Sequence, residues 1–108
     1  MFATNRIVIF MKREESFITN LTKLYVLFIL FRGPAHGYDI MKEFKASTGK
    51  VLSPGQIYPL LVAMQRKGFV EVSIKVEGKR QRKIYALNDK GKDFANNLRE
   101  KIVRVLGL

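Results

Sequence analysis

A cluster of basic residues at positions 79–83 is the densest group of side chains that could bind a second molecule. It contains Lys79, Arg80, Arg82 and Lys83. Cations grouped in this way contact nucleic-acid phosphates, and an arginine among them can enter a minor groove. The competing interpretation is a solvated loop, because lysine and arginine are ordinary surface residues. The spacing therefore predicts either a phosphate-binding tip or an exposed turn.

The stretch from Ser53 to Gly68 carries a second set of candidate contact residues. The members that could touch a base or a phosphate are Ser53, Gln56, Tyr58, Pro59 and Arg66. A glutamine amide can form two hydrogen bonds with adenine, and apolar neighbours such as Val62 can touch thymine methyl groups. The alternative is that Gln56 only caps a helix and that Tyr58 packs against the core. Since Arg66 is the one arginine of this set, we expect sparse base readout, with much of the binding through DNA shape and phosphates.

Residues suited to catalysis or metal binding are scarce. The chain has no cysteine and one histidine, His36, so a thiolate metal site is excluded and a His-based centre is not expected. His36 is expected to be structural, and Tyr38 and Tyr85 to be core or interface residues. Glu14 and Glu15 belong to a charged run and do not form a carboxylate pair for acid–base chemistry. The sequence predicts a protein that is not an enzyme and that has no metal and no cofactor.

The overall charge points to a polyanionic partner. The chain has 20 lysines and arginines against 9 acidic residues, a formal net charge of +11. We expect nucleic acid first and an anionic membrane second, while charge that only aids solubility is the plain alternative. The longest apolar run, residues 24–31, is too short to span a bilayer, and the run at 7–11 is too short for a signal peptide. We therefore expect a cytoplasmic protein with double-stranded DNA as its partner and no membrane partner.

The stretch from Ser53 to Gly68 has the start and stop signals of a helix. Ser53 suits the N-cap, Pro54 suits the first helical position, and Gln56 completes a capping box. Gly68 provides the C-terminal stop. The apolar positions fall at i, i+3, i+4 and i+7 and predict one buried stripe, formed by Ile57, Leu60, Leu61 and Met64.

The periodicities of the whole chain predict helices near 20–32, 38–48, 54–67 and 89–106, and strands near 69–76 and 82–87. The two strands form a hairpin, and the alternation of apolar and polar residues in the first predicts a half-buried strand. Residues 33–37 are expected to form a turn, and Gly49 lies in the turn of a helix-turn-helix. This order is that of a mainly α winged helix-turn-helix fold with a small β-hairpin, whose third helix is the recognition helix. A buried strand at 24–31 is the competing interpretation of the first helix.

The same order divides the chain into an N-terminal extension at 1–19, a winged-helix DNA-binding domain at 20–88 and a C-terminal dimerisation helix at 89–108. The last helix has an apolar stripe that one small domain leaves uncovered, formed by Phe94, Leu98, Ile102 and Val105. We expect a homodimer through the first and C-terminal helices. The run at 7–11 fits either a strand or the apolar half of a short helix. We expect an extra helix that packs at the dimer interface, with Phe10 in contact with the partner.

Four stretches occur in a recognisable order and cover about residues 20–92. They are Gly33-Pro34-Ala35-His36-Gly37-Tyr38-Asp39-Ile40, Leu52-Ser53-Pro54-Gly55-Gln56-Ile57-Tyr58-Pro59-Leu60-Leu61, Lys67-Gly68-Phe69-Val70 and Arg82-Lys83-Ile84-Tyr85-Ala86-Leu87-Asn88-Asp89-Lys90-Gly91. Together they resemble the PadR family of winged-helix transcriptional regulators. The resemblance implies a homodimeric repressor that binds a palindromic operator, and that in some members releases the operator when a small aromatic ligand binds.

Three features depart from the family pattern. Asn88 stands where a threonine usually caps the final helix, and both residues cap well. The tryptophan that stacks on ligands in some drug-binding members has no counterpart, because the chain has no Trp, so the sequence identifies no small-molecule effector. The chain ends soon after one C-terminal helix, and we expect no large C-terminal effector domain.

We therefore expect a sequence-specific DNA-binding transcriptional regulator that acts as a repressor. Two other functions fit the same residues. A nucleoid-type protein would bind any duplex, and a protein-interaction winged helix would bind no DNA at moderate salt. Binding to a palindromic site, compared with random DNA at physiological salt, distinguishes the three.

Overall fold

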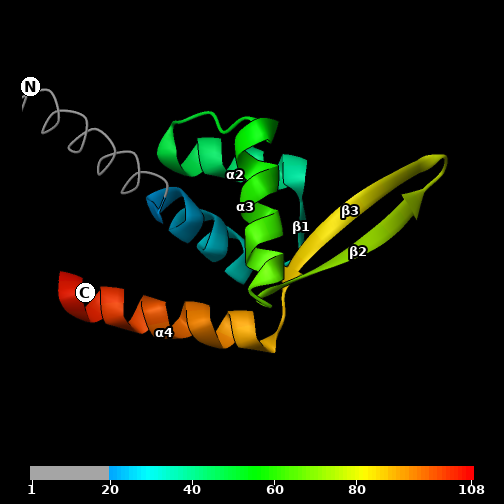
Figure 1. The fold of residues 1–108 in the computed structure, drawn as a ribbon. Helices are drawn as coiled ribbons and strands as arrows, with labels where there is room; N and C mark the ends of the chain where they lie inside the picture. Colours follow the sequence, from blue (N-terminus) through cyan, green and yellow to red (C-terminus); the bar gives the residue numbers. More distant parts are fainter. Residues whose placement is uncertain (1–19) are drawn as a thin grey trace, which may run out of the picture.

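Figure 1 shows the computed structural model of the protein, which describes residues 20–108. The described part begins with a helix over residues 20–31. The elements that follow are β1 (Ala35–His36), α2 (Gly37–Thr48), α3 (Pro54–Arg66), β2 (Val70–Glu77), β3 (Arg80–Leu87) and α4 (Asp89–Leu106). This order confirms the predicted winged helix-turn-helix. Because residues 24–31 are helical, the strand interpretation of that segment is wrong.

Local signals explain where the two helices of the helix-turn-helix end and begin. Helix α2 ends at Gly49, whose φ of 75° lies in the left-handed region that glycine adopts without strain. The Gly49 N–H donates to the Lys45 carbonyl over 2.8 Å. Helix α3 begins at Pro54, after Ser53 in an extended conformation. The loop between the helices is therefore fixed at both ends by short-range contacts.

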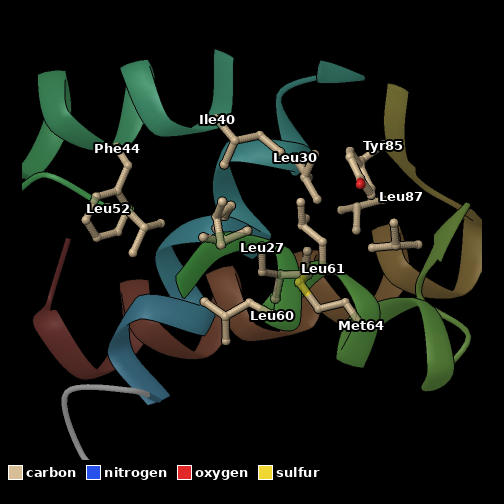
Figure 2. Close-up of a cluster of buried hydrophobic side chains, with 14 residues drawn as sticks. Leu27, Leu30, Ile40, Phe44, Leu52, Leu60, Leu61, Met64, Tyr85 and Leu87 are labelled. Atoms are coloured by element: carbon tan, nitrogen blue, oxygen red, sulfur yellow. The ribbon is translucent and has the colours of Figure 1, made fainter. Parts of the chain in front are cut away.

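The core lies where the helices meet strand β3, as Figure 2 shows. Leu30 from the first helix, Ile40 from α2 and Leu61 from α3 are each at most 2% exposed. Tyr85 and Leu87 of β3 are buried at the edge of this cluster. The predicted stripe of α3 is buried throughout, formed by Ile57, Leu60, Leu61 and Met64. This burial holds the opposite face of α3 toward solvent.

The three strands form an antiparallel sheet in the order β1-β3-β2. The sequence predicts only a turn at residues 33–37, and this is incomplete because two of these residues form β1. Ala35 pairs with Tyr85, and His36 pairs with Ile84. A strand of two residues has no periodicity of its own and exists only through its pairing with β3. Its position brings the start of α2 next to the hairpin.

The outer half of the hairpin carries two exposed apolar side chains. Ile74 is 62% exposed and Val76 is 65% exposed. The alternation in β2 predicts that both lie on the covered face of a half-buried strand, and for these two residues this is wrong. Only Val70 and Val72, at the base of the strand, meet the core. The hairpin projects away from the helices in Figure 1, so no described element covers its outer half.

Helix α4 is anchored to the turn that follows α3. As predicted, Asn88 caps α4, and its Oδ1 accepts a hydrogen bond from the Gly91 N–H over 2.8 Å. The Asn88 Nδ2 donates to the Gly68 carbonyl over 2.6 Å, and the Asn88 N–H donates to the Phe69 carbonyl over 3.0 Å. Gly91 approaches the same Phe69 carbonyl so closely that a Cβ would overlap it. The first turn of α4 is thereby joined to the turn that follows α3.

The predictions for the N-terminal extension, including a helix at 7–11 and an interface role for Phe10, lie outside the described residues. Within residues 20–108, no helix is both long enough and apolar enough to cross a membrane.

Candidate nucleic-acid interface

The outward face of α3 is exposed along the helix and lies opposite the buried stripe. Its residues recur every three or four positions and are Gly55, Pro59, Val62 and Arg66. Val62 is 43% exposed. Pro59 lies inside the helix, which nevertheless runs without a break. Because this face is narrow and carries one charge at its far end, the α3 backbone can come close to another surface.

Gln56 caps α3 from its first turn. Its Oε1 accepts hydrogen bonds from the Ser53 N–H over 3.0 Å and from the Ser53 hydroxyl over 3.1 Å. A carbonyl oxygen offers two lone pairs, so these two donors use its capacity. The structure therefore contains the capping contact expected of Gln56, and its NH2 group is the part left for a further contact. The Ser53 hydroxyl is likewise engaged in the cap, because it donates to the Gln56 Oε1.

Tyr58 turns from the outward face toward the start of α2. A Cβ on Gly37 would lie 3.0 Å from both Cε1 and the hydroxyl oxygen of Tyr58, so the glycine makes room for the ring. Tyr58 is 43% exposed, and it therefore lies on the surface instead of in the core. Burial raises the pKa of the neighbouring Tyr85 hydroxyl, and the nearby Tyr58 adds to the increase. The Tyr85 hydroxyl therefore keeps its proton to a higher pH than an ordinary tyrosine does.

A groove of about 570 Å³ lies between α2, α3 and the hairpin. It is lined by His36, Gly37, Tyr38, Tyr58, Gln81, Arg82, Lys83 and Tyr85. The His36 Nδ1–H donates to the Lys83 carbonyl over 3.3 Å, which ties β1 to the wall of the groove. Helix α2 starts here without a side-chain cap on its first turn. Helix N–H groups, tyrosine hydroxyls and cations are the groups that bind phosphate. Among residues 20–108, no cluster of His, Cys, Asp or Glu could hold a metal ion.

The four predicted cations of the hairpin, here called the wing cations, are Lys79, Arg80, Arg82 and Lys83, and all are exposed. The register pairs Arg80 with Glu77 and Arg82 with Lys75, on one face of the hairpin. Lys83 lies on the other face, and it lines the groove together with Arg82. Glu77 lies 3.9 Å from the Arg82 Nε and 3.5 Å from the Lys75 Nζ. Exposed ion pairs of this kind are weak, so the wing tip keeps its cationic character.

The four predicted dimerisation residues lie on α4 with unequal exposure. Phe94 is 42% exposed and Val105 is 85% exposed, whereas Leu98 and Ile102 are half-buried. The Phe94 ring stacks on Phe69 with a centroid distance of 4.7 Å. The C-terminal half of α4 therefore carries apolar side chains that residues 20–108 do not cover.

Five residues of the groove are not marked as contact residues by the sequence: His36, Gly37, Tyr38, Gln81 and Tyr85. Tyr85 is buried, as the core alternative predicts, whereas Tyr38 is 66% exposed, which leaves the interface alternative for that residue. These residues come together because β1 pairs with β3 and because Tyr58 packs on Gly37. Neither contact has a signal in the local sequence, although the charge of the adjacent wing does indicate the region.

The sequence profile of the Transcriptional regulator PadR-like family matches residues 26–97. The chain belongs to this family. The Negative transcriptional regulator PadR of Bacillus subtilis (strain 168) is 37% identical over 73 residues, which are 65% of this chain and 40% of that protein. The Transcriptional regulator YqjI of Escherichia coli (strain K12) is 30% identical over 93 residues, 84% of this chain and 44% of that protein. This PadR-family chain thus spans less than half the length of either relative.

Solved structures of other proteins have the same fold. A transcriptional regulator from Thermoplasma acidophilum is 36% identical, with a TM-score of 0.69, over 84% of this chain and 94% of that chain. Bacillus subtilis PadR in complex with operator DNA is 31% identical, with a TM-score of 0.65, over 72% of this chain and 45% of that chain. The predicted family resemblance and the winged-helix fold are therefore confirmed.

Proposed function

We propose that this PadR-family protein binds a specific, palindromic DNA operator as a homodimer and represses transcription. The groove carries the proposal, because it joins groups from α2, α3 and β3 that each suit a DNA backbone. The exposed face of α3 beside it has the narrow shape of a helix that enters a major groove. Repression is supported by the relative named a negative transcriptional regulator, and operator binding by the PadR structure that contains operator DNA. In this proposal the protein works in the cytoplasm and catalyses no reaction.

The groove would hold a backbone phosphate next to the recognition helix. Lys83 supplies a cation, and the uncapped first turn of α2 supplies N–H donors. Tyr85 supplies a hydroxyl that can donate a hydrogen bond. Phosphate oxygens only accept hydrogen bonds, so a site built from donors and cations complements them. Contacts of this kind fix the register of α3 on the duplex without reading its sequence.

A second copy of the chain is proposed to cover the apolar part of α4. Val105 is 85% exposed, which is unusual for a valine on an amphipathic helix. An apolar hollow lies between the first half of α4 and the first helix, and is lined in part by Leu24, Leu27, Phe94 and Leu98. Two-fold pairing through these surfaces would present two recognition helices about 34 Å apart, one turn of DNA, and would explain a palindromic operator.

Selection of bound sites from a random duplex pool tests sequence specificity. We expect a palindromic site whose affinity at physiological salt exceeds that of random DNA by about 1,000-fold or more. Equal affinity for both duplexes would favour a nucleoid-type protein. A lack of retardation at moderate salt would favour a winged helix that binds protein.

Replacing Tyr58 with phenylalanine tests the groove, since it removes one hydroxyl and keeps the ring. We expect weaker binding to every duplex with an unchanged salt slope, because the lost group is uncharged. Tyr25→Phe is the matched control, because Tyr25 is also 43% exposed but lies on the first helix and does not line the groove. Wild-type affinity in Tyr58→Phe would contradict a phosphate contact by this hydroxyl.

The wing is tested by Arg80→Ala combined with Arg82→Ala. Each lost phosphate contact lowers the slope of log affinity against log salt by about 0.9, so a dimer that uses both arginines would lose roughly 3–4. Lys92→Ala combined with Arg99→Ala removes two exposed cations from α4 and serves as the control. A wild-type slope in the wing variant would mean that the wing is only a solvated loop.

Sedimentation of Leu98→Asp combined with Ile102→Asp tests the dimer, and we expect the size of a monomer. Because Leu98 also packs against the core, Val105→Asp provides a second variant at a position that is 85% exposed. Asn97→Asp adds the same charge at an exposed polar position of α4 and should keep the wild-type size. If folded Leu98/Ile102 and Val105 variants both keep that size, α4 is not the interface.

A further inference from the structure

The middle of the outward α3 face is apolar. Gly55, Pro59, Val62 and Arg66 lie on one side of the helix, over about 16 Å at a rise of 1.5 Å per residue. Gly55 has no side chain, and Arg66 is the last residue of α3. Between them, Pro59 and Val62 are the exposed side chains of this stripe, about 4.5 Å apart along the axis. A duplex that meets this face therefore meets a pyrrolidine ring and an isopropyl group.

The polar neighbours of these two residues are engaged elsewhere. A bidentate contact with adenine needs the oxygen of a glutamine amide as acceptor for the N6 amino group. In Gln56 that oxygen already accepts from the Ser53 N–H and the Ser53 hydroxyl, over 3.0 and 3.1 Å. Tyr58 lines the groove and packs on Gly37, away from the outward stripe. The bidentate use of Gln56 predicted from sequence would therefore cost the capping contact.

We propose that Pro59 and Val62 read thymine through its C5 methyl group, so that the operator carries thymines at the positions facing the middle of α3. This inference rests on the proposed function, because it presupposes that α3 enters a major groove. Among the four bases only thymine presents a methyl group there, and apolar side chains recognise it by contact. Pro59 and Val62 lie three residues apart on the same side of α3, so both can meet thymine methyl groups in one major groove.

The test replaces single thymines of the selected operator with deoxyuridine, which removes the methyl group and keeps the base pairing. We expect binding to weaken about fourfold at each contacted thymine, the effect of uncovering one methyl-sized group. When the replacement is made in both half-sites, the loss should be about fifteenfold by the same rule. Thymines outside the α3 contact should show no change.

Val62→Ala identifies the residue responsible. At one contacted position, its affinity ratio between thymine and deoxyuridine should fall from about four to near one, because the isopropyl contact is gone. Val76→Ala is the matched control, since Val76 is an exposed valine on the wing and should leave the ratio unchanged. Thermal unfolding of both variants checks that they fold.

Two outcomes would overturn the inference. One is a wild-type protein that discriminates its operator from random DNA yet tolerates deoxyuridine at every position. The other is a Val62→Ala variant that keeps the wild-type ratio at all positions. Both leave the proposed function standing, whereas a failure to select any preferred site would remove the proposed function itself.

Discussion

Replacing Gly91 with alanine should destabilise the protein by about 1–3 kcal/mol, the usual range for inserting a methyl group where there is no space. The new Cβ would overlap the Phe69 carbonyl oxygen, and a backbone atom cannot move aside as a side chain can. That carbonyl also accepts a hydrogen bond from the Asn88 N–H over 3.0 Å. Displacing the carbonyl would weaken this bond, whose net contribution to stability is roughly 0.5–1.5 kcal/mol. Alanine is the better helix former by up to about 1 kcal/mol, which offsets only part of this.

Gly55→Ala is the matched control. Gly55 also lies in the first turn of a helix, but its added Cβ would meet only the Ser53 Oγ, at 3.9 Å. Its stability should stay the same or rise by up to about 1 kcal/mol, the helix propensity of alanine over glycine. Thermal and denaturant unfolding at one fixed protein concentration measure both variants, since the stability of a dimer depends on concentration.

For a domain of this size, Gly91→Ala should lower Tm by at least about 4 °C relative to wild type, since each kcal/mol shifts Tm by roughly 4–8 °C. A Gly91→Ala protein as stable as Gly55→Ala would refute the reasoning. It would mean that α4 can tilt away from Phe69 at little cost, and that the junction is not rigid.

Three further predictions concern caps and titration. Asn88→Ala should cost about 1–2 kcal/mol of stability, because the cap on Gly91 and the hydrogen bond to Gly68 are both lost. Asn88→Thr should recover part of this loss in denaturant unfolding. Equal unfolding midpoints for wild type, Asn88→Ala and Asn88→Thr would contradict this prediction. Gln56→Ala should lower stability by about 1 kcal/mol, while Gln56→Glu keeps the acceptor oxygen and should stay near the wild-type stability. If Gln56→Ala has the wild-type melting temperature in thermal unfolding, a stabilising cap is excluded. Burial raises the pKa of Tyr85, so the unfolded chain loses this proton first, and the free energy of unfolding should fall as pH rises above about 10. Denaturant midpoints between pH 8 and 11 should fall less in Tyr85→Phe than in wild type, and identical slopes would remove this contribution.

The helices were predictable because their ends are encoded locally. Helix α4 is predicted at 89–106 and observed at Asp89–Leu106, since Asn88 carries the cap and the apolar stripe carries the rest. Helix α3 is predicted at 54–67 and observed at Pro54–Arg66, because a proline and a capping pair mark its start. Such signals act over three or four residues and do not depend on the rest of the fold.

Features that depend on distant partners were not predictable. The strand β1 exists because Ala35 and His36 meet β3, and nothing in these two residues requires it. Ile74 and Val76 follow the same alternation as the buried base of β2, but their exposure depends on how far the hairpin extends past the helices. Periodicity identifies a face of a strand, and only the packing of the whole domain decides whether that face is covered.

The candidate interface was predictable in its charge but not in its shape. The wing cations and the outward residues of α3 are recognisable by type and spacing. The groove between them depends on Tyr58 packing against Gly37, which are far apart in the sequence. The same limitation applies to Gln56, whose residue type suits both a base contact and a cap, and whose oxygen the structure assigns to the cap.

The junction at Asn88 and Gly91 makes α4 a lever arm. With 18 residues the helix is about 27 Å long, so a tilt of 10° at its first turn would displace its far end by about 5 Å. In the proposed dimer this displacement would change the separation of the two recognition helices, which must match one turn of DNA. A small angular change at one junction could therefore take both half-sites out of phase while each hydrophobic core stays intact. The close packing of Gly91 on the Phe69 carbonyl would therefore keep the two recognition helices in register with the DNA.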